Sequence, residues 1–173
     1  MKRVLSLLLV ALLLGLSACT SSEPVKVGNL STENDNAEES STVFQVGETA
    51  MLKDVKATLA GVTQSDGSEY NKPGEGNVFV LCEFVIENNS DEELSISSLM
   101  CFSAYCDDYA CDYSFSALLE SEGKNQLDGS IAPGKKMDGV IGYEVPADWQ
   151  ELEIHFTPNF ISSDEFVFVA TNN

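Results

Sequence analysis

Residues 78–87 read VFVLCEFVIE, and this stretch decides the fold class. Its even positions are all apolar: Val78, Val80, Cys82, Phe84 and Ile86. Two of its odd positions are the glutamates Glu83 and Glu87. A two-residue period with one polar face is typical of a β-strand that is buried on one side. The run NNSD at residues 88–91 then supplies turn-forming side chains. We therefore predict a half-buried strand followed by a chain reversal.

Short apolar runs separated by turn residues continue on both sides of this strand. They predict further strands over residues 49–53, 55–64, 94–97, 100–106, 110–114, 130–132, 137–145, 151–157 and 165–170. Short strands at this spacing favour a β-sandwich or barrel over βαβ units. Residues 114–120, SFSALLE, predict one helical turn with Ser114 or Ser116 as its N-cap. We expect that turn to be a connector between strands and not a layer.

The N-terminal sequence predicts export and lipid attachment. Lys2 and Arg3 precede the apolar run 4–16, and Ser17-Ala18-Cys19 follows it. This order of charged, apolar and small residues is typical of a signal peptide, and the run is shorter than the ~20 residues of a membrane-spanning helix. The sequence LSAC ending at Cys19 resembles a bacterial lipobox, in which the cysteine takes a diacylglycerol group and becomes the first mature residue. An ordinary secretory signal ending at Ala18 is the alternative.

Lipidation predicts both the localisation and the domain organisation. A diacylglyceryl group at Cys19 supplies two acyl chains, which hold a protein stably on a membrane. We expect the protein at the cell membrane, lipid-anchored on its extracytoplasmic face. Residues 1–18 are the predicted signal peptide, residues 19–42 the lipidated N-terminus with a flexible acidic linker, and residues 43–173 the folded domain. The linker has no aromatic residue and many Ser, Asn and Glu, so it buries too little apolar surface to order itself. The alternative is an extra strand over residues 25–30.

The chain is strongly acidic. Its formal charge is −19, and removing Lys2 and Arg3 with residues 1–18, which contain no acidic residue, changes that charge to −21. Such a charge excludes nucleic acid as a partner and opposes a flat position on anionic lipid, because both need basic residues. It favours solubility outside the cell and a monomer. Weak binding of divalent cations is the alternative explanation.

The folded part also resembles a known family. The motifs are residues 47–49 (GET), 68–73 (SEYNKP), 75–77 (EGN), 85–90 (VIENNS) and 131–136 (IAPGKK). In this order, over about residues 46–168, they resemble the domain of unknown function 4352, an Ig-like extracellular domain found behind bacterial lipoprotein signals. The resemblance implies an all-β fold, an immunoglobulin-like antiparallel β-sandwich. It implies no established activity and therefore no functional residues. The chain departs from the family at three cysteines, at 101, 106 and 111, which suggests a specialised local hairpin.

Four cysteines follow the predicted lipidation site: Cys82, Cys101, Cys106 and Cys111. An even number of cysteines in an exported domain predicts two disulfides, for which three pairings are possible. Because Cys106 and Cys111 enclose a hairpin tip, we predict Cys106–Cys111 together with Cys82–Cys101. The alternative is free thiols that act as small core residues. Their spacing is unlike a zinc site and the chain has one His, so we expect no metal and no cofactor.

The segment around this hairpin is rich in tyrosine and aspartate. The predicted binding surface consists of Tyr105, Asp107, Asp108, Tyr109 and Tyr113. Tyrosines provide contact area at a low cost in entropy, and clusters of them are typical of recognition surfaces. The alternative is that they cover the end of a sandwich. The aspartates lack the spacing of a calcium-binding loop.

No catalytic residue is predicted. His155 is expected at the surface, because Leu152, Ile154 and Phe156 share the opposite face of its strand. No motif places a nucleophile and an orienting acid beside it. Trp149 is also expected near the surface, and the loop of residues 65–76 is a second candidate for binding.

These observations predict a membrane-anchored extracellular lipoprotein that is not an enzyme. Its Ig-like domain is expected to act as a binding or accessory module for an extracellular protein or a cell-envelope component. The alternative is a structural or antigenic envelope protein without a specific ligand. A buried pocket with converging polar groups would instead indicate an enzyme.

Overall fold

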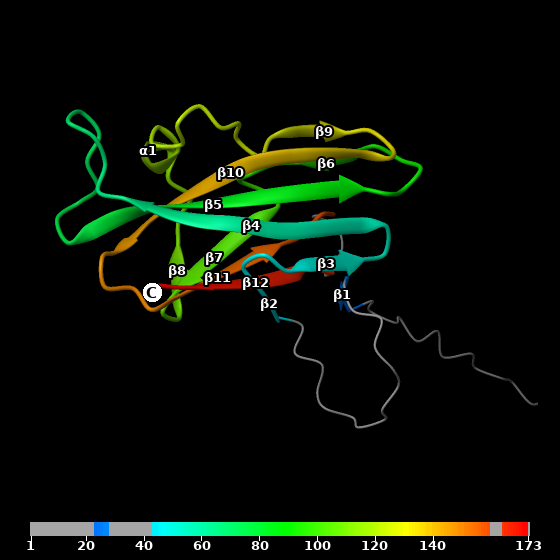
Figure 1. Ribbon diagram of the computed structural model, residues 1–173, viewed down its shortest axis with the longest axis horizontal. Coiled ribbons are helices and arrows are strands. Elements are labelled where there is room, and N and C mark those ends of the chain that lie inside the picture. Colours follow the sequence, from blue (N-terminus) through cyan, green and yellow to red (C-terminus); the bar gives the residue numbers. More distant parts are fainter. Residues whose placement is uncertain (1–22, 28–42, 160–163, 173) are drawn as a thin grey trace, which may run out of the picture.

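Strand β5, Asn77–Asn88, forms where the sequence alternates most clearly. In the computed structural model, which describes residues 23–27, 43–159 and 164–172, this strand lies inside one of two packed sheets (Figure 1). Its even positions from Val78 to Ile86 face the interior and are buried. The predicted signal peptide and the lipidation site at Cys19 lie outside the described residues, as does most of the predicted linker.

The two large sheets have five strands each. The first has the order β1-β3-β4-β5-β10, and its other strands are β1 (Val25–Lys26), β3 (Thr49–Leu52), β4 (Val55–Ser65) and β10 (Lys135–Pro146). The second has the order β2-β12-β11-β7-β8, with β2 (Val43–Gln45), β12 (Phe166–Thr171), β11 (Glu151–Phe156), β7 (Phe102–Cys106) and β8 (Tyr109–Cys111). Strands β6 (Leu94–Ile96) and β9 (Gly129–Ile131) form a separate ribbon.

The core lies between the two large sheets. Phenylalanine rings meet across it: the ring of Phe84 on β5 lies 5.4 Å from Phe102 on β7 and 5.4 Å from Phe168 on β12, between centroids. Aromatic pairs at such distances add to the stabilisation that comes from burial alone. The predicted all-β sandwich is confirmed, and each strand predicted from the sequence is present, with ends that differ by up to three residues.

Two pairings were not foreseen. Strand β2 pairs with β12 in parallel, beginning at Val43 opposite Val167, whereas the other pairs of named strands are antiparallel. Strand β1 pairs with β3, with Val25 opposite Met51. The backbone N–H of Val27 donates to the carbonyl of Thr49 at 2.8 Å, and Pro24 is buried. At these residues the alternative of an extra strand is correct, and the expectation of a linker without structure is wrong.

The predicted helical turn is α1, Phe115–Leu118, and Ser114 is its N-cap, whose side chain accepts from the backbone N–H of Ala117 at 3.2 Å. The helix is more than a connector. It packs on the outer face of the first sheet, where Ala117 meets Phe79 and Leu81. These two apolar residues stand at odd positions of β5, and α1 is what buries them.

Glycines on β10 let the segment between β8 and β9 lie close to it. A Cβ at Gly142 would be 2.7 Å from the Cβ of Ala117 and 3.1 Å from the carbonyl oxygen of Ser114. A Cβ at Gly139 would be 2.9 Å from the carbonyl oxygen of Asn125. The backbone N–H of Ser114 also donates to Gly142 O at 2.7 Å. The segment thereby covers part of an otherwise open sheet edge.

Candidate functional site

The β7–β8 hairpin closes with a two-residue turn. Asp107 and Asp108 both have positive φ, 47° and 68°, and Cys106 pairs with Tyr109 directly across the turn. Positive φ at both central residues is typical of the tightest hairpins, and aspartate tolerates it better than most residues. The tip is therefore shorter than the four residues enclosed by Cys106 and Cys111.

Asp107 is a structural residue at this tip. Its carboxylate accepts backbone N–H bonds from Gln150 at 3.0 Å and from Glu151 at 2.9 Å. Its own N–H donates to the carbonyl of Glu151 at 3.0 Å. These bonds tie the hairpin to the start of β11, whereas Asp108 is exposed.

The five predicted binding residues do not form one surface. Successive side chains of a strand point to opposite faces. Tyr105 lies on the outer face of the second sheet, in a shallow hollow of about 330 Å³ that Asp107, Asp108 and His155 also line. Tyr109 and Tyr113 instead line a groove on the other side of the hairpin. The single tyrosine surface expected from the sequence is thus divided between two faces.

That groove is the largest hollow described, with a volume of about 870 Å³. Three segments form its walls: the β7–β8 hairpin, the start of α1, and the connection from β10 to β11. Tyr109 is 79% exposed and Phe115 63% exposed, and the ring of Tyr113 meets that of Phe115 edge to face at 4.9 Å. Four carboxylates also line it, from Asp107, Asp112, Glu144 and Asp148.

Sequence reasoning missed part of this groove. Phe115 and the carboxylates of Glu144 and Asp148 were not singled out, since they come from separate segments. The pattern SFSALLE does contain a signal: Phe115 and Leu119 are four residues apart, so both point to one side of a helical turn. Leu119 is 75% exposed, so the sandwich core does not use that side of the turn.

Neither predicted disulfide is formed in the structure, where Cys82, Cys101, Cys106 and Cys111 are all free thiols. The hairpin register places Cys111 opposite Ala104, so Cys106 and Cys111 are diagonal neighbours whose side chains hydrogen-bond. The titratable neighbour of Cys82 is Cys111, while the sulfur of Cys101 accepts from Ser97 N–H at 3.4 Å. The expected bond between Cys82 and Cys101 is thus not formed in this structure.

Burial makes these thiols poor nucleophiles. Burial is the largest of the causes that together raise the pKa of Cys106 to about 12, and nearby negative charges such as that of Asp107 are among the others. Burial likewise raises the pKa of Cys82, Cys101 and Cys111. A thiol reacts as the thiolate, so a raised pKa suppresses its reactivity near neutral pH.

His155 is half-buried and not freely exposed as expected. Its Nε2 lies 2.6 Å from Glu153 Oε1, and its Nδ1 lies 3.2 Å from Glu165 Oε2. Burial lowers the pKa of His155, but the hydrogen bonds and charges of the two glutamates outweigh burial, so the pKa is raised. Tyr105 packs edge to face on its ring at 5.5 Å. Both ring nitrogens are therefore engaged by carboxylates.

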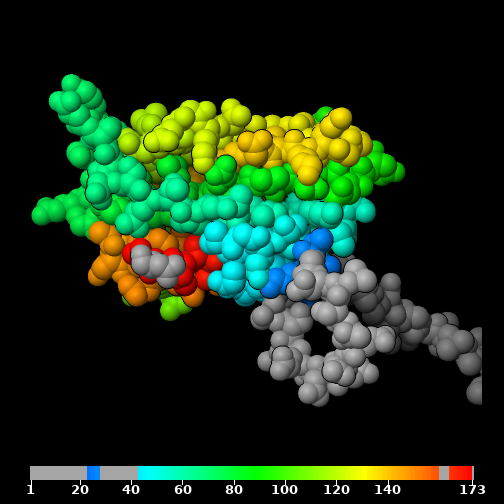
Figure 2. Space-filling view, viewed as in Figure 1, coloured from blue at the N-terminus to red at the C-terminus, as the bar shows by residue number. Residues whose placement is uncertain are grey.

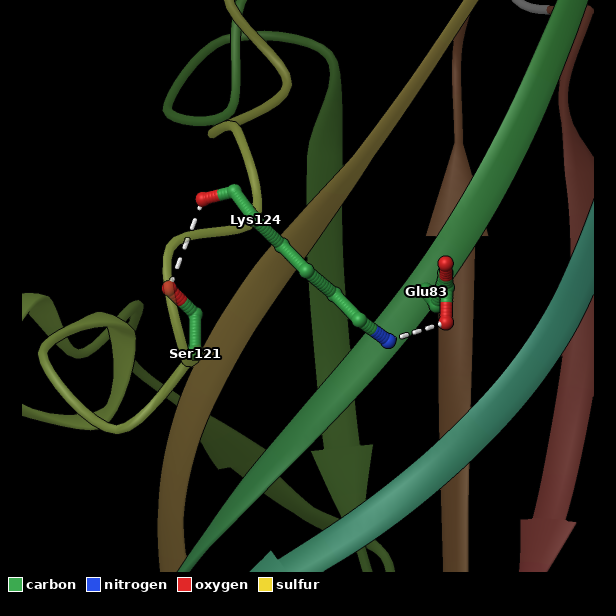
Figure 3. Close-up of polar contacts among 3 residues, drawn as sticks. All are labelled: Glu83, Ser121 and Lys124. Carbon is green, nitrogen blue, oxygen red and sulfur yellow. Dashed lines mark hydrogen bonds and ion pairs between the residues drawn. The ribbon is translucent and has the colours of Figure 1, made fainter.

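A second, smaller hollow of about 390 Å³ lies on the outer face of the first sheet, beside α1. Figure 3 shows Lys124 reaching across β10 to form an ion pair with Glu83 on β5. The hydroxyl of Ser121 donates to the carbonyl of Lys124 at 3.4 Å. This pair closes one side of the hollow.

The loop of residues 66–76 projects from the end of the molecule at which α1 lies (Figures 1 and 2). Asn71 Nδ2 donates to the carbonyl of Ser116 at 2.8 Å, and Gly74 N–H donates to Glu144 Oε1 at 2.8 Å. Tyr70 stands on this loop and is 92% exposed. Trp149, in contrast, is buried in the hydrophobic core, and its Nε1 donates to Oε1 of the exposed Gln64 at 2.8 Å.

The fold and this groove define an immunoglobulin-like β-sandwich domain with an open, aromatic hollow at one edge. The chain belongs to the family described as domain of unknown function DUF4352, whose profile matches residues 44–167. No curated protein matches the chain.

Solved structures of low sequence identity share the fold. The candidate lipoprotein ycdA of Bacillus subtilis is 16% identical with a TM-score of 0.55, over 68% of this chain and 36% of its own, so this chain spans about a third of its length. The yjhA protein of Bacillus subtilis is 19% identical with a TM-score of 0.54, over 72% of this chain and 97% of its own. An uncharacterized β-sandwich protein of Clostridium difficile is 17% identical with a TM-score of 0.50, over 80% of this chain and all of its own.

No helix among the described residues is long and apolar enough to cross a membrane. No group of three or more His, Cys, Asp or Glu side chains in residues 23–27, 43–159 and 164–172 is arranged to hold a metal ion.

Proposed function

We propose that this protein is a lipid-anchored, non-catalytic binding module that holds an extracellular protein or a cell-envelope component in the groove beside the β7–β8 hairpin. The observation that carries the proposal is the exposure of large aromatic side chains on rigid elements. Tyr109 and Phe115 are among the most exposed aromatic residues of the domain, yet both belong to ordered elements that the core holds in place. Exposed aromatic groups around a hollow are typical of interaction sites.

The proposal of a module without catalysis is supported by the state of the reactive side chains. Both nitrogens of His155 are engaged by glutamates on the outer face, away from the groove. The thiols of Cys106 and Cys111, at the groove, have a raised pKa. Neither arrangement presents an activated nucleophile beside a base.

The proposal of a lipid anchor is supported by the sequence LSAC that ends at Cys19. A similar fold in ycdA, a candidate lipoprotein, agrees with it. Substituting Cys19→Ala is expected to move the protein from the membrane fraction to the medium. Retention of the variant in the membrane fraction would contradict the anchor.

Cross-linking on intact cells tests the binding module, with the native lipoprotein as bait and mass spectrometry as readout. The test variant is Tyr109→Ala with Phe115→Ala, inside the groove. The matched control is Tyr70→Ala with Tyr105→Ala, which removes two exposed aromatic side chains outside it. One dominant partner that is lost in the groove variant and kept in the control supports the proposal. A diffuse set of neighbours that is the same in both variants overturns it and favours a structural coat protein.

A further inference from the structure

The groove carries negative charge on two of its three walls. Asp112 belongs to the hairpin side and Asp148 to the connection from β10 to β11, and both line the groove. The charge of Asp112 acts on Cys111, and that of Asp148 acts on Cys106. Each of the two carboxylates therefore lies near one thiol of the Cys106 and Cys111 pair.

These two carboxylates are available to a ligand. Asp107 and Glu144 are occupied, the first by backbone N–H groups of β11 and the second by Gly74 and Asn77. Asp112 and Asp148 are exposed, and their side-chain carboxylates form no hydrogen bond or ion pair with the described part of the chain, where only the backbone carbonyl of Asp148 accepts, from Gln150 Nε2 at 2.7 Å. No Lys, Arg or His among the described residues lines the groove.

The aromatic residues of the groove complement these charges. The rings of Tyr109 and Phe115 are open to the groove, and a cation above such a ring is attracted to it. Tyr113 also lines the groove, and its hydroxyl is buried and has no hydrogen-bond partner in the described residues. A chain with a formal charge of −19 also attracts basic partners over distance.

We propose that the groove binds a basic segment of a partner polypeptide, with an arginine side chain between Asp112 and Asp148 and against the rings of Tyr109 and Phe115. This inference rests on the proposed binding function and adds the chemistry of the partner. Arginine fits because its planar guanidinium pairs with carboxylates and stacks on aromatic faces, whereas lysine offers only a point charge. A neutral glycan would use the rings but not the two carboxylates.

The test measures binding of a fluorescent hexa-arginine peptide to the full-length lipoprotein in detergent micelles, at low and moderate salt. Hexa-lysine and hexa-glutamine peptides of the same design are compared. The groove variant is Asp112→Asn with Asp148→Asn. The matched control is Asp108→Asn with Glu153→Gln, which removes the same charge from the outer face.

We expect hexa-arginine to bind at least tenfold more tightly than hexa-glutamine and several-fold more tightly than hexa-lysine. The groove variant should lose at least tenfold in affinity and the control no more than about twofold. Equal losses in both variants would show general attraction to an acidic surface and overturn the arginine site. If cross-linking still finds a partner that depends on Tyr109 and Phe115, the proposed function stands while this inference fails.

A second inference rests on strand β1, which an independent set of contacts holds in place. Besides the Val27 to Thr49 hydrogen bond, Lys26 forms an ion pair with Glu48. Val25 comes six positions after the predicted lipid site Cys19, and six residues of extended chain span at most about 20 Å. If β1 were not attached, the tether would run from Cys19 to the start of β2 at Val43. A fully extended chain of that length would reach about 80 Å.

We infer that β1 holds the domain close to the membrane and gives it a preferred orientation. Strand β1 lies near one end of the sandwich, with the β3–β4 turn, and α1 and the loop of residues 66–76 lie at the other end (Figures 1 and 2). The β1 end then faces the bilayer, and the α1 end points outward. This inference rests on the lipid anchor and not on the arginine site.

Fluorescence energy transfer from the protein to a lipid-bound acceptor tests this orientation. The vesicles consist of phosphatidylcholine with one quarter phosphatidylglycerol. A fluorescent amino acid replaces Asp54 in the β3–β4 turn or Tyr70 in the outer loop of the full-length lipoprotein. Transfer should be at least twofold more efficient from position 54 than from position 70. Val27→Pro, which lacks the N–H that bonds Thr49, should reduce the transfer from position 54, whereas Val27→Ala should not.

Equal transfer from the two positions, or a Val27→Pro protein that behaves like Val27→Ala, would overturn the orientation. Failure of the native chain to bind vesicles at all, with Cys19→Ala behaving identically, would instead contradict the lipid anchor itself. The two failures are therefore distinguishable.

Discussion

Asp107 Oδ1 lies 2.9 Å from the backbone nitrogen of Glu151, and this contact joins the tip of the β7–β8 hairpin to the start of β11. The same oxygen lies 3.0 Å from the nitrogen of Gln150. One carboxylate therefore fixes the relative position of two walls of the groove. A residue expected to contact a ligand instead shapes the place where the ligand is proposed to bind.

Replacing Asp107 by Ala should lower the free energy of unfolding by roughly 1–3 kcal/mol, because backbone N–H groups lose a charged acceptor and alanine resists positive φ. Urea denaturation measures the change. Asp108→Asn is the control, since Asp108 is exposed and an amide tolerates its backbone conformation; it should change the stability by less than about 0.5 kcal/mol. Equal effects of the two substitutions would contradict the structural role of Asp107.

Replacing Gly142 by Ala should displace α1. The new Cβ would lie 2.7 Å from the Cβ of Ala117 and 3.1 Å from a backbone oxygen, so the helix must move. We expect a loss of roughly 1–3 kcal/mol of stability, as for other overpacked sites, and a change in the fluorescence or NMR signals of the groove tyrosines. Gly61→Ala is the matched control, because a Cβ there meets nothing within 4 Å. A Gly142→Ala protein as stable as Gly61→Ala would contradict this packing.

The stability of the protein should depend on the protonation of His155. Its pKa is raised in the folded state, so the charged form stabilises the fold below the unfolded value of 6.5, and this contribution is lost as the pH rises through the folded pKa. The difference in stability between the native chain and His155→Gln should therefore be larger at pH 5.5 than at pH 8.5.

NMR titration provides the direct measurement for this group. The chain has one histidine, so its ring signals need no assignment. Glu153→Gln should lower the midpoint of the titration, because it removes one of the two carboxylates that favour the charged ring. A midpoint at or below 6.5 in the native chain would contradict the contacts described.

Cys106 should resist alkylation in the folded protein. With a pKa of about 12, about one thiol in ten thousand is ionised at pH 8, against about a quarter for an ordinary cysteine. We expect reaction with iodoacetamide to be more than a hundredfold slower than in a peptide, and to recover in urea. Timed labelling with mass spectrometry measures both rates. The contrary result would be that Cys106 stays unreactive in urea and that the mass of the chain is lower by two hydrogens. That result would show that the Cys106–Cys111 disulfide forms in the cell.

Much of the fold could be predicted because it depends on local periodicity. The alternation along β5 identified its buried face from Val78 to Ile86. The turn at Asn88 was also foreseen, and the structure shows how it works: the buried Asn88 amide donates to the carbonyl of Glu92 at 2.7 Å and to that of Ile131 at 2.8 Å. Only the second of these bonds, to β9, needed knowledge of the tertiary structure.

The errors occurred where a residue's partner is distant in sequence. Val25 and Lys26 lie in a polar segment, and it is β3 that turns them into a strand. Trp149 looked like a surface residue, but it packs in the core between the sheets, and its hydrogen-bond partner, Gln64, lies 85 residues away. The predicted Cys106–Cys111 disulfide depended on a pairing that only the hairpin register could decide.

The amino-acid sequence by itself determined an all-β domain, the positions of its turns and its membership of a family, because side-chain alternation and turn propensity act over a few residues. The tertiary structure alone decided which residues of the hairpin share a face, how Asp112 and Asp148 come to flank one groove, and where β1 attaches. Those relationships join segments that meet only when the two sheets pack, and no local pattern encodes the distance between them.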